Sequence, residues 1–108
     1  MEETRKLLDA YYQAINSKDT GKIKTFLNAN VKVTFPDSNR NWSGSELVDK
    51  NFGSMWSIFP NFKVEEYTLA RVTEIDGDVD VDVEIEATFA DREKNYLARK
   101  YMKYEICN

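Results

Sequence analysis

Histidine is missing from this 108-residue chain, and cysteine occurs only once, at Cys107. Histidine is the commonest general base in enzymes and the commonest ligand of transition metals. Its absence excludes Ser–His and Cys–His nucleophile pairs, and it leaves a zinc site without its usual ligands. We therefore expect neither a bound metal nor a cofactor. A lone cysteine cannot form an internal disulfide, which is typical of proteins from a reducing compartment.

Long apolar runs are also missing, since no stretch approaches the ~20 residues that a membrane-spanning helix needs. The first six residues carry charges of both signs, and no apolar segment like that of a signal peptide follows them. The net charge is −4, and the 15 basic residues are scattered along the chain. These features predict a cytoplasmic protein. They argue against a nucleic-acid or membrane partner, because nucleic acids and anionic membranes both favour a basic surface.

Three segments have the spacing of apolar residues that is typical of amphipathic helices: residues 3–16, 19–27 and 43–59. The side of the first helix that faces the core is expected to carry Leu7, Leu8, Tyr11, Ala14 and Ile15. Ser17 or Asp19 is expected to cap the second helix. Ser43 and Glu46 have the spacing of a capping box at the start of the third, and Pro60 ends it.

Five segments alternate between apolar and polar residues and are predicted to be strands: residues 31–35, 40–42, 62–75, 78–90 and 96–107. Asp76-Gly77 is a strong signal for a hairpin turn between two of them. Helices packed on one face of an antiparallel sheet make an α+β fold. The length suits a single domain over residues 1–108.

The strand expected at 78–90 carries carboxylates on one face and apolar side chains on the other. A calcium-binding surface is one interpretation of the acidic row, but calcium ligands usually come from a tight loop rather than an extended strand. We instead predict a solvated outer face on which acidic side chains pair with basic ones across the strands. The expected basic partners are Lys63, Arg71, Arg99 and Lys103.

Three motifs resemble signatures of one protein family. Residues 10–19 (Ala-Tyr-Tyr-Gln-Ala-Ile-Asn-Ser-Lys-Asp) are similar to the first-helix signature of SnoaL-like proteins. Residues 42–47 are similar to the opening of that family's third helix, and residues 59–62 (Phe-Pro-Asn-Phe) to its link into the long strands. The chain thus resembles the SnoaL-like branch of the nuclear transport factor 2-like superfamily. The resemblance implies three N-terminal helices on a strongly curved, mixed but mainly antiparallel sheet, which together form a cone-shaped α+β barrel.

The chain departs from the family pattern at its end. Family members usually carry one more strand, in the middle of the sheet, where this chain ends at Asn108. The loss of that strand would leave a gap or two unpaired edges. Either the sheet closes differently here or a partner chain fills the space. We therefore expect a homodimer formed through the sheet.

The resemblance includes ketosteroid isomerase, which uses a carboxylate base with an oxyanion hole of a tyrosine and a protonated aspartate. In this chain Tyr11 falls at the tyrosine position, Phe35 at the base position and Met102 near the aspartate position. Asp37, two residues beyond Phe35, would supply the base if its turn points inward, whereas Pro36–Asn39 would otherwise be a solvated turn. An isomerase or lyase acting on a hydrophobic carbonyl substrate would use Asp37 as the base and Tyr11 as the electrophile.

Aromatic side chains border the expected sheet more richly than a small core requires. An apolar cavity with a few hydroxyl groups is the usual form of a small-molecule site. The residues expected to line such a cavity are Tyr11, Phe35, Trp42, Phe52, Met55, Trp56, Met102 and Tyr104. Three functions follow from these observations: a binding domain for a small, flat, mostly apolar ligand, the isomerase- or lyase-type enzyme, and a homodimeric assembly module with a filled core.

Overall fold

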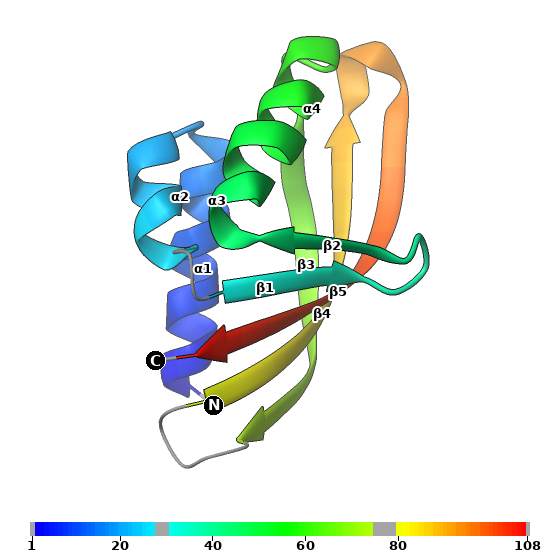
Figure 1. Cartoon of the computed structure of the whole chain (residues 1–108). Coiled ribbons are helices and arrows are strands. Elements are labelled where there is room, and N and C mark those ends of the chain that lie inside the picture. Colours follow the sequence, from blue (N-terminus) through cyan, green and yellow to red (C-terminus); the bar gives the residue numbers. More distant parts are fainter. Residues whose placement is uncertain (1, 28–30, 75–79, 108) are drawn as a thin grey trace.

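The computed structural model describes residues 2–27, 31–74 and 80–107, and it confirms an α+β fold (Figure 1). The helical elements are α1 (Glu2–Asn16), α2 (Thr20–Phe26), α3 (Gly44–Glu46), η1 (Leu47–Phe52), α4 (Gly53–Ile58) and η2 (Arg92–Lys94). The strands are β1 (Val31–Phe35), β2 (Arg40–Ser43), β3 (Lys63–Glu74), β4 (Asp80–Asp91) and β5 (Tyr96–Cys107). These bounds follow the predicted ranges closely. The hairpin turn expected at Asp76-Gly77 lies outside the described residues.

The five strands form one sheet in the order β2-β1-β5-β4-β3. Every neighbouring pair of described strands is antiparallel, so the expectation of a mixed sheet was wrong. The expected gap beside β1 is not found among the described strands either, because β5 itself pairs with β1. Val31 lies opposite Ile106, and Thr34 lies opposite Lys103. The last strand of the chain thus occupies the middle of the sheet, without a further strand.

β5 is paired differently along its length. Residues 103–106 lie between β1 and β4 and pair with both strands. Residues 96–102 pair with β4, and no other described strand pairs with them. The first half of β5 is therefore an edge of the described sheet, and its second half is interior.

α1 lies against the long strands and supplies a compact part of the core (Figure 1). Its buried side chains follow the i, i+3, i+4, i+7 spacing of a helix face and are Leu8, Tyr11, Tyr12 and Ile15, together with Ala14. The predicted inward side is therefore largely confirmed, but Leu7 is 49% exposed. Leu7 borders a small apolar space between α1, α2 and the sheet, and about half of it remains in solvent.

The first motif has a clear structural role at the end of α1. The side-chain nitrogen of Asn16 donates to the Val64 carbonyl (3.0 Å), and its side-chain oxygen accepts from the Val64 amide (2.8 Å). Three residues later, the carboxylate of Asp19 accepts from the Lys22 amide (3.1 Å) and caps α2. The Asn-x-x-Asp segment therefore turns the chain between two helices and attaches that turn to β3.

The helical segment 44–58 combines α3, η1 and α4 and begins at the predicted capping box. The Ser43 side chain accepts from the Glu46 amide, and the Glu46 side chain accepts from the Ser43 amide. The sequence did not predict the middle of the segment, because Leu47–Phe52 is a π-helix rather than an α-helix. π-helical turns are rare, wider than α-helical ones, and frequent at functional sites.

A buried aspartate ties the end of this segment to the turn between β4 and β5. Asp91 is fully buried, and its carboxylate accepts from the amides of Asn61 (2.9 Å), Glu93 (3.1 Å) and Lys94 (3.2 Å). These three donors compensate the loss of water around the carboxylate. The Phe59-Pro60-Asn61-Phe62 link is therefore fixed above the sheet, and it holds the end of α4 in place.

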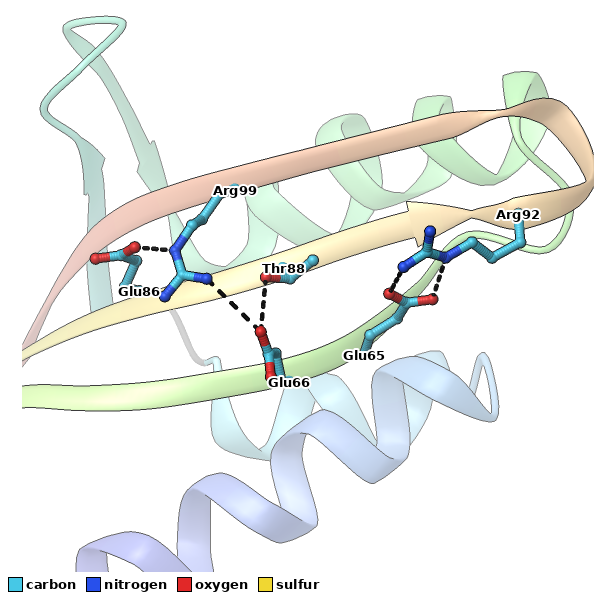
Figure 2. A network of polar contacts seen from close by, with 6 residues as sticks. All are labelled: Glu65, Glu66, Glu86, Thr88, Arg92 and Arg99. Carbon is cyan, nitrogen blue, oxygen red and sulfur yellow. Dashed lines mark hydrogen bonds and ion pairs between the residues drawn. The ribbon is translucent and has the colours of Figure 1, made fainter.

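The outer face of the sheet carries a network of opposite charges (Figure 2). Arg99 bonds to Glu86 and also forms an ion pair with Glu66 (3.6 Å), while Arg92 holds both carboxylate oxygens of Glu65 (2.7 and 2.6 Å). Two further cross-strand pairs join Arg71 to Glu84 and Lys103 to Asp82. These contacts confirm the predicted pairing for Arg71, Arg99 and Lys103, whereas Lys63, the fourth expected partner, forms no ion pair with a described residue. Since exposed ion pairs add only about 0–1 kcal/mol each, their main effect is a solvated outer face.

Candidate functional site

A cavity of about 450 Å³ lies between the helical segment 44–58, the turn that joins β1 to β2, and the inner face of the sheet. In Figure 1 the helical segment stands in front of the long strands, with the β1–β2 hairpin below it. The apolar part of the wall consists of Phe35, Leu47, Phe52, Met55, Phe62, Phe89 and Met102. Its polar residues are Asp37, Ser38, Arg40, Asn51, Tyr96, Lys100, Tyr104 and Tyr101, the last of which directs its hydroxyl away to Glu84. The volume falls within the ~300–1,000 Å³ that is usual for small-molecule sites.

The alternation of side chains along β5 places two buried residues, Met102 and Tyr104, at the base of the cavity, which we call its floor. Residues directly opposite each other in antiparallel strands point to the same face of a sheet. Met102 lies opposite Ile85, and Tyr104 lies opposite Val83, and all four side chains are buried. The inner row of β5 therefore presents Met102 and Tyr104 to the cavity.

The π-helical turn supplies a second side of the wall. Leu47, Asn51 and Phe52 all belong to η1 and all line the cavity. Leu47 and Phe52 are buried, whereas Asn51 is partly exposed and brings an amide group to an otherwise apolar surface. α4 then adds Met55, which is also only partly buried. The helical segment thus faces the sheet across the cavity.

Tyr104 is the buried hydroxyl of the site. Its oxygen lies 3.0 Å from the hydroxyl oxygen of Tyr11 and 3.8 Å from the sulfur of Met102. If Tyr11 donates to Tyr104, the Tyr104 hydroxyl donates to the Met102 sulfur. A thioether sulfur is a weak acceptor. The proton of Tyr104 can therefore move to a better acceptor that enters the cavity.

Tyr11 stands behind Tyr104 and does not line the main cavity. It borders a second, apolar space of about 40 Å³ between α1, α2 and the sheet, and Tyr104 lines both spaces. Burial raises the pKa of Tyr11 well above its ordinary value, and the nearby Tyr104 raises it further. Burial also raises the pKa of Tyr104, although the hydrogen bond from Tyr11 opposes that rise. Both phenols are hydrogen-bond donors at neutral pH rather than bases.

Asp37 lies at the cavity wall on the turn between β1 and β2, and it is exposed. The turn contains hydrogen bonds from the Ser38 amide to the Phe35 carbonyl (3.2 Å) and from the Asn39 amide to the Pro36 carbonyl (3.3 Å). Asn39 adopts a left-handed conformation with φ of 54°, which asparagine tolerates better than most residues. Asp37 is therefore solvated, as expected for a turn that does not point inward. It is also one of the residues that line the cavity.

The two predicted tryptophans lie elsewhere. Trp56 donates its ring N–H to the Phe62 carbonyl (3.2 Å), and its ring packs beside Phe52 with centroids 5.8 Å apart. Trp42 lies opposite Val33 in the β1–β2 pair, and its buried ring nitrogen has no hydrogen-bond partner among the described residues. Neither tryptophan is part of the cavity wall. Of the eight predicted lining residues, the structure therefore brings together Phe35, Phe52, Met55, Met102 and Tyr104.

Sequence reasoning missed six polar residues of the wall, namely Ser38, Arg40, Asn51, Tyr96, Lys100 and Tyr101. A signal for Lys100 was present, because it alternates in phase with Ala98, Met102 and Tyr104 on the predicted last strand. A signal for Asn51 was present as well, because it lies four residues from both Leu47 and Met55 on the predicted third helix.

The chain matches no family model, no curated protein and no solved structure. The resemblance to SnoaL-like proteins therefore stays a prediction that rests on its three motifs. Across the described ranges, no helix is long and apolar enough to cross a membrane. Within the same ranges, no three acidic or cysteine side chains come together in a way that could hold a metal ion.

Proposed function

We propose that this chain is a small-molecule binding domain whose site is the cavity beneath the helical segment 44–58. The observation that carries the proposal is a cavity of about 450 Å³ lined by seven apolar residues and by the buried Tyr104, with further polar residues around them. On this proposal the helices and the curved sheet form the cone-shaped enclosure that the SnoaL-like resemblance implies. The ligand is flat and mostly apolar.

Tyr104 supports the proposal because, when Tyr11 donates to it, its own proton has only the weak Met102 sulfur as an acceptor. Its hydroxyl contacts a methionine sulfur at 3.8 Å and is polarised by Tyr11 at 3.0 Å. A carbonyl oxygen of a ligand would replace the sulfur as acceptor and form a stronger hydrogen bond. Apolar surface would then supply most of the affinity, and Tyr104 would fix the orientation of the ligand.

The test is a screen of aromatic ketones and polycyclic compounds by ligand-observed NMR, with two matched variants. Met55→Trp places an indole in the cavity, because Met55 lines it. Ser57→Trp adds the same side chain two residues along α4, where the residue is exposed and outside the cavity wall. We expect compounds that bind the wild type and Ser57→Trp but lose at least about tenfold in affinity for Met55→Trp. A library with no binder, or binders unaffected by Met55→Trp, would contradict the proposal.

A second candidate is an isomerase or lyase, favoured by the presence of Asp37 and Tyr104 on the same cavity wall. Asp37 would remove a proton next to the carbonyl of a hydrophobic substrate, and Tyr104 would donate to the oxygen as negative charge develops there. Tyr11, the electrophile that the sequence suggested, would act through Tyr104 because it lies behind it. Tyr11 is then a positioning residue.

Two substitutions separate binding from turnover. Asp37→Asn should leave the affinity for an aromatic ketone unchanged if the protein only binds, and should abolish proton exchange at its α-carbon if the protein is an enzyme. The exchange is read by deuterium incorporation from heavy water. Tyr104→Phe should weaken binding in both cases. An absence of exchange with every bound ketone would exclude the enzyme for that substrate class.

We also propose that the chain forms a homodimer through the sheet. We propose a cytoplasmic location for the protein. The support for the dimer is the edge at residues 96–102 of β5, which only β4 pairs among the described strands. Light scattering during size-exclusion chromatography gives the mass directly, and a value of 12.6 kDa would exclude the dimer. The filled-core assembly module is disfavoured by the cavity itself.

A further inference from the structure

The cavity carries two basic side chains for which the apolar ligand proposed above gives no reason. Lys100 and Arg40 both line it, on β5 and β2 respectively. Lys100 lies opposite Ala87, a buried residue of the inner face. Arg40 lies opposite Phe35, which is itself part of the cavity wall. Strand register therefore directs both cations to the face that holds the cavity.

The basic residues on the other face of the sheet are used differently. Arg99 and Lys103 belong to the same strand as Lys100, but they point outward and pair with Glu86 and Asp82 (Figure 2 shows Arg99). Neither Lys100 nor Arg40 forms an ion pair with any residue that the structure describes. Four basic residues of the described strands form no ion pair with a described residue, namely Lys32, Arg40, Lys63 and Lys100, and two of them, Arg40 and Lys100, lie beside the cavity.

The charges at the cavity favour an anion. Asp37 is the single acidic residue of the wall, against Lys100 and Arg40. All three are exposed, whereas the floor formed by Met102 and Tyr104 is buried. A ligand that places its apolar body on the floor would bring its other end to the basic side chains. A carboxylate suits that end, because it accepts hydrogen bonds from both lysine and arginine.

We propose that the ligand of this cavity is an amphipathic carboxylate, with an apolar body inside and a carboxylate held by Lys100 and Arg40 at the rim. This inference rests on the proposed binding function and adds the chemical class of the ligand to it. An inward-pointing lysine on an edge strand can also serve to prevent strand association. That role predicts no preference for a charged ligand, so the two explanations differ in a measurable way.

The experiment compares two probes of nearly the same shape, 2-naphthoate and 2-naphthamide, by isothermal titration calorimetry at pH 7. A carboxylate is ionised at that pH and the amide is neutral. We expect the wild type to bind the naphthoate roughly five- to tenfold more tightly, as for an ion pair at the rim of a site. Raising the salt concentration should reduce this preference, because the cations are exposed.

Matched variants assign the preference to the rim. Lys100→Met should remove most of this preference, because it lowers the affinity for the naphthoate more than the affinity for the naphthamide, and Lys100→Arg should retain the preference. Lys103→Met is the control, since it removes the same side chain from the same strand on the opposite face. Arg40→Met tests the second cation in the same way.

The outcomes distinguish this inference from the binding function beneath it. Equal binding of both probes by the wild type would overturn the carboxylate and leave the cavity function standing. So would a naphthoate preference that survives in the Lys100→Met/Arg40→Met double variant. If neither probe binds, and the ketone screen also yields no binder, the proposed function fails and the inference fails with it.

Discussion

α1 and the helical segment 44–58 lie against the same sheet but cover it to different degrees. α1 buries five side chains, among them Ile15 and Ala14, whereas the segment 44–58 buries Leu47, Val48 and Phe52 in η1 and no side chain in α4. Under α1 the interior is filled except for a space of about 40 Å³. Under the other segment a cavity of about 450 Å³ remains. The part of the sheet under α1 is thus covered by a well-packed core, whereas the part under the segment 44–58 borders a large cavity.

The difference teaches which part of the chain secures the fold. The Asn16 side chain and the Tyr11–Tyr104 hydrogen bond join α1 to strands that are distant in the sequence. The segment 44–58 is held by the buried side chains of η1, by the Ser43–Glu46 capping box and by the Asp91 turn, whereas α4 adds no fully buried side chain. We therefore expect substitutions under α1 to reduce stability strongly, and substitutions under α4 to change binding more than stability.

Truncation of a buried side chain should separate the two halves most clearly. Ile15→Ala removes a fully buried side chain and should lower the free energy of unfolding by about 3 kcal/mol. Met55→Ala removes a partly buried side chain that already borders a cavity, and should lower it by less than about 1 kcal/mol. Urea unfolding followed by circular dichroism measures both values. Similar losses from the two variants would show that both halves contribute equally to the core.

The attachment of α1 to β3 should have the next largest effect. Asn16→Ala removes both hydrogen bonds to Val64 and leaves the amide and carbonyl of Val64 without the side chain that satisfied them. This should lower the free energy of unfolding by about 2 kcal/mol. Asn61→Ala is the control, because its side chain makes an exposed bond to Glu93 and its backbone bond to Asp91 is kept. We expect a loss of less than about 0.5 kcal/mol for the control. If Asn16→Ala behaves like Asn61→Ala, the α1 end is held by packing alone.

Alkaline pH should weaken the α1 half through its buried phenols. Burial raises the pKa of Tyr11 and of Tyr12 well above the ordinary value, so these groups stay neutral in the folded chain while the unfolded chain ionises near pH 10. Below about pH 10 both phenols are neutral in the folded and the unfolded chain, so they do not change the free energy of unfolding with pH. Above pH 10 only the unfolded chain loses the proton, and each phenol lowers the free energy of unfolding by about 1.4 kcal/mol per pH unit. Urea unfolding between pH 8 and pH 11 gives the slope.

Tyr11→Phe isolates the contribution of one phenol, because phenylalanine does not titrate. We expect the stability of this variant to fall less steeply above pH 10 than that of the wild type, by one phenol's share. Tyr101 is the comparison residue, since its ring lies on the outer face and its hydroxyl bonds to Glu84. An unchanged slope in Tyr11→Phe would mean that Tyr11 ionises inside the folded protein.

The capping box should give the smallest effect on stability. Ser43→Ala removes the acceptor for the Glu46 amide and should destabilise the chain by about 1 kcal/mol. Ser45→Ala, two residues later, removes a hydroxyl from the helix interior and should change stability by less than about 0.5 kcal/mol. Thermal unfolding measures both variants. Because residues of the segment 44–58 form one side of the cavity, Ser43→Ala should also weaken binding of the naphthoate.

Local sequence patterns predicted the elements of this fold well. Alternation in the last two strands gave the buried faces of β4 and β5, including Ile85, Met102 and Tyr104. Capping residues marked the starts of helices at Asp19 and Ser43. Each of these signals depends on residues that are close together in the sequence, which is why a single sequence contains it.

Contacts between distant residues limited the prediction of the site. The pairing of β1 with β5 joins residues more than 60 positions apart, and no local pattern specifies it. Tyr11 was placed in the cavity because it lies on the inner side of α1, but Tyr104 comes between it and the cavity. Helical spacing correctly gives Phe52 and Met55 as lining residues of that segment, but it does not indicate the π-helical turn over Leu47–Phe52.

The divided pairing of β5 has a consequence for backbone dynamics. In an antiparallel sheet, alternate amides of a strand point to opposite neighbours. Amides in residues 103–106 therefore find acceptors on both β1 and β4, whereas in residues 96–102 those pointing away from β4 meet no described strand. Hydrogen exchange should be slow at every position of the second half and alternately fast and slow along the first. The edge of the cavity is thus the part of the central strand that opens most readily to solvent.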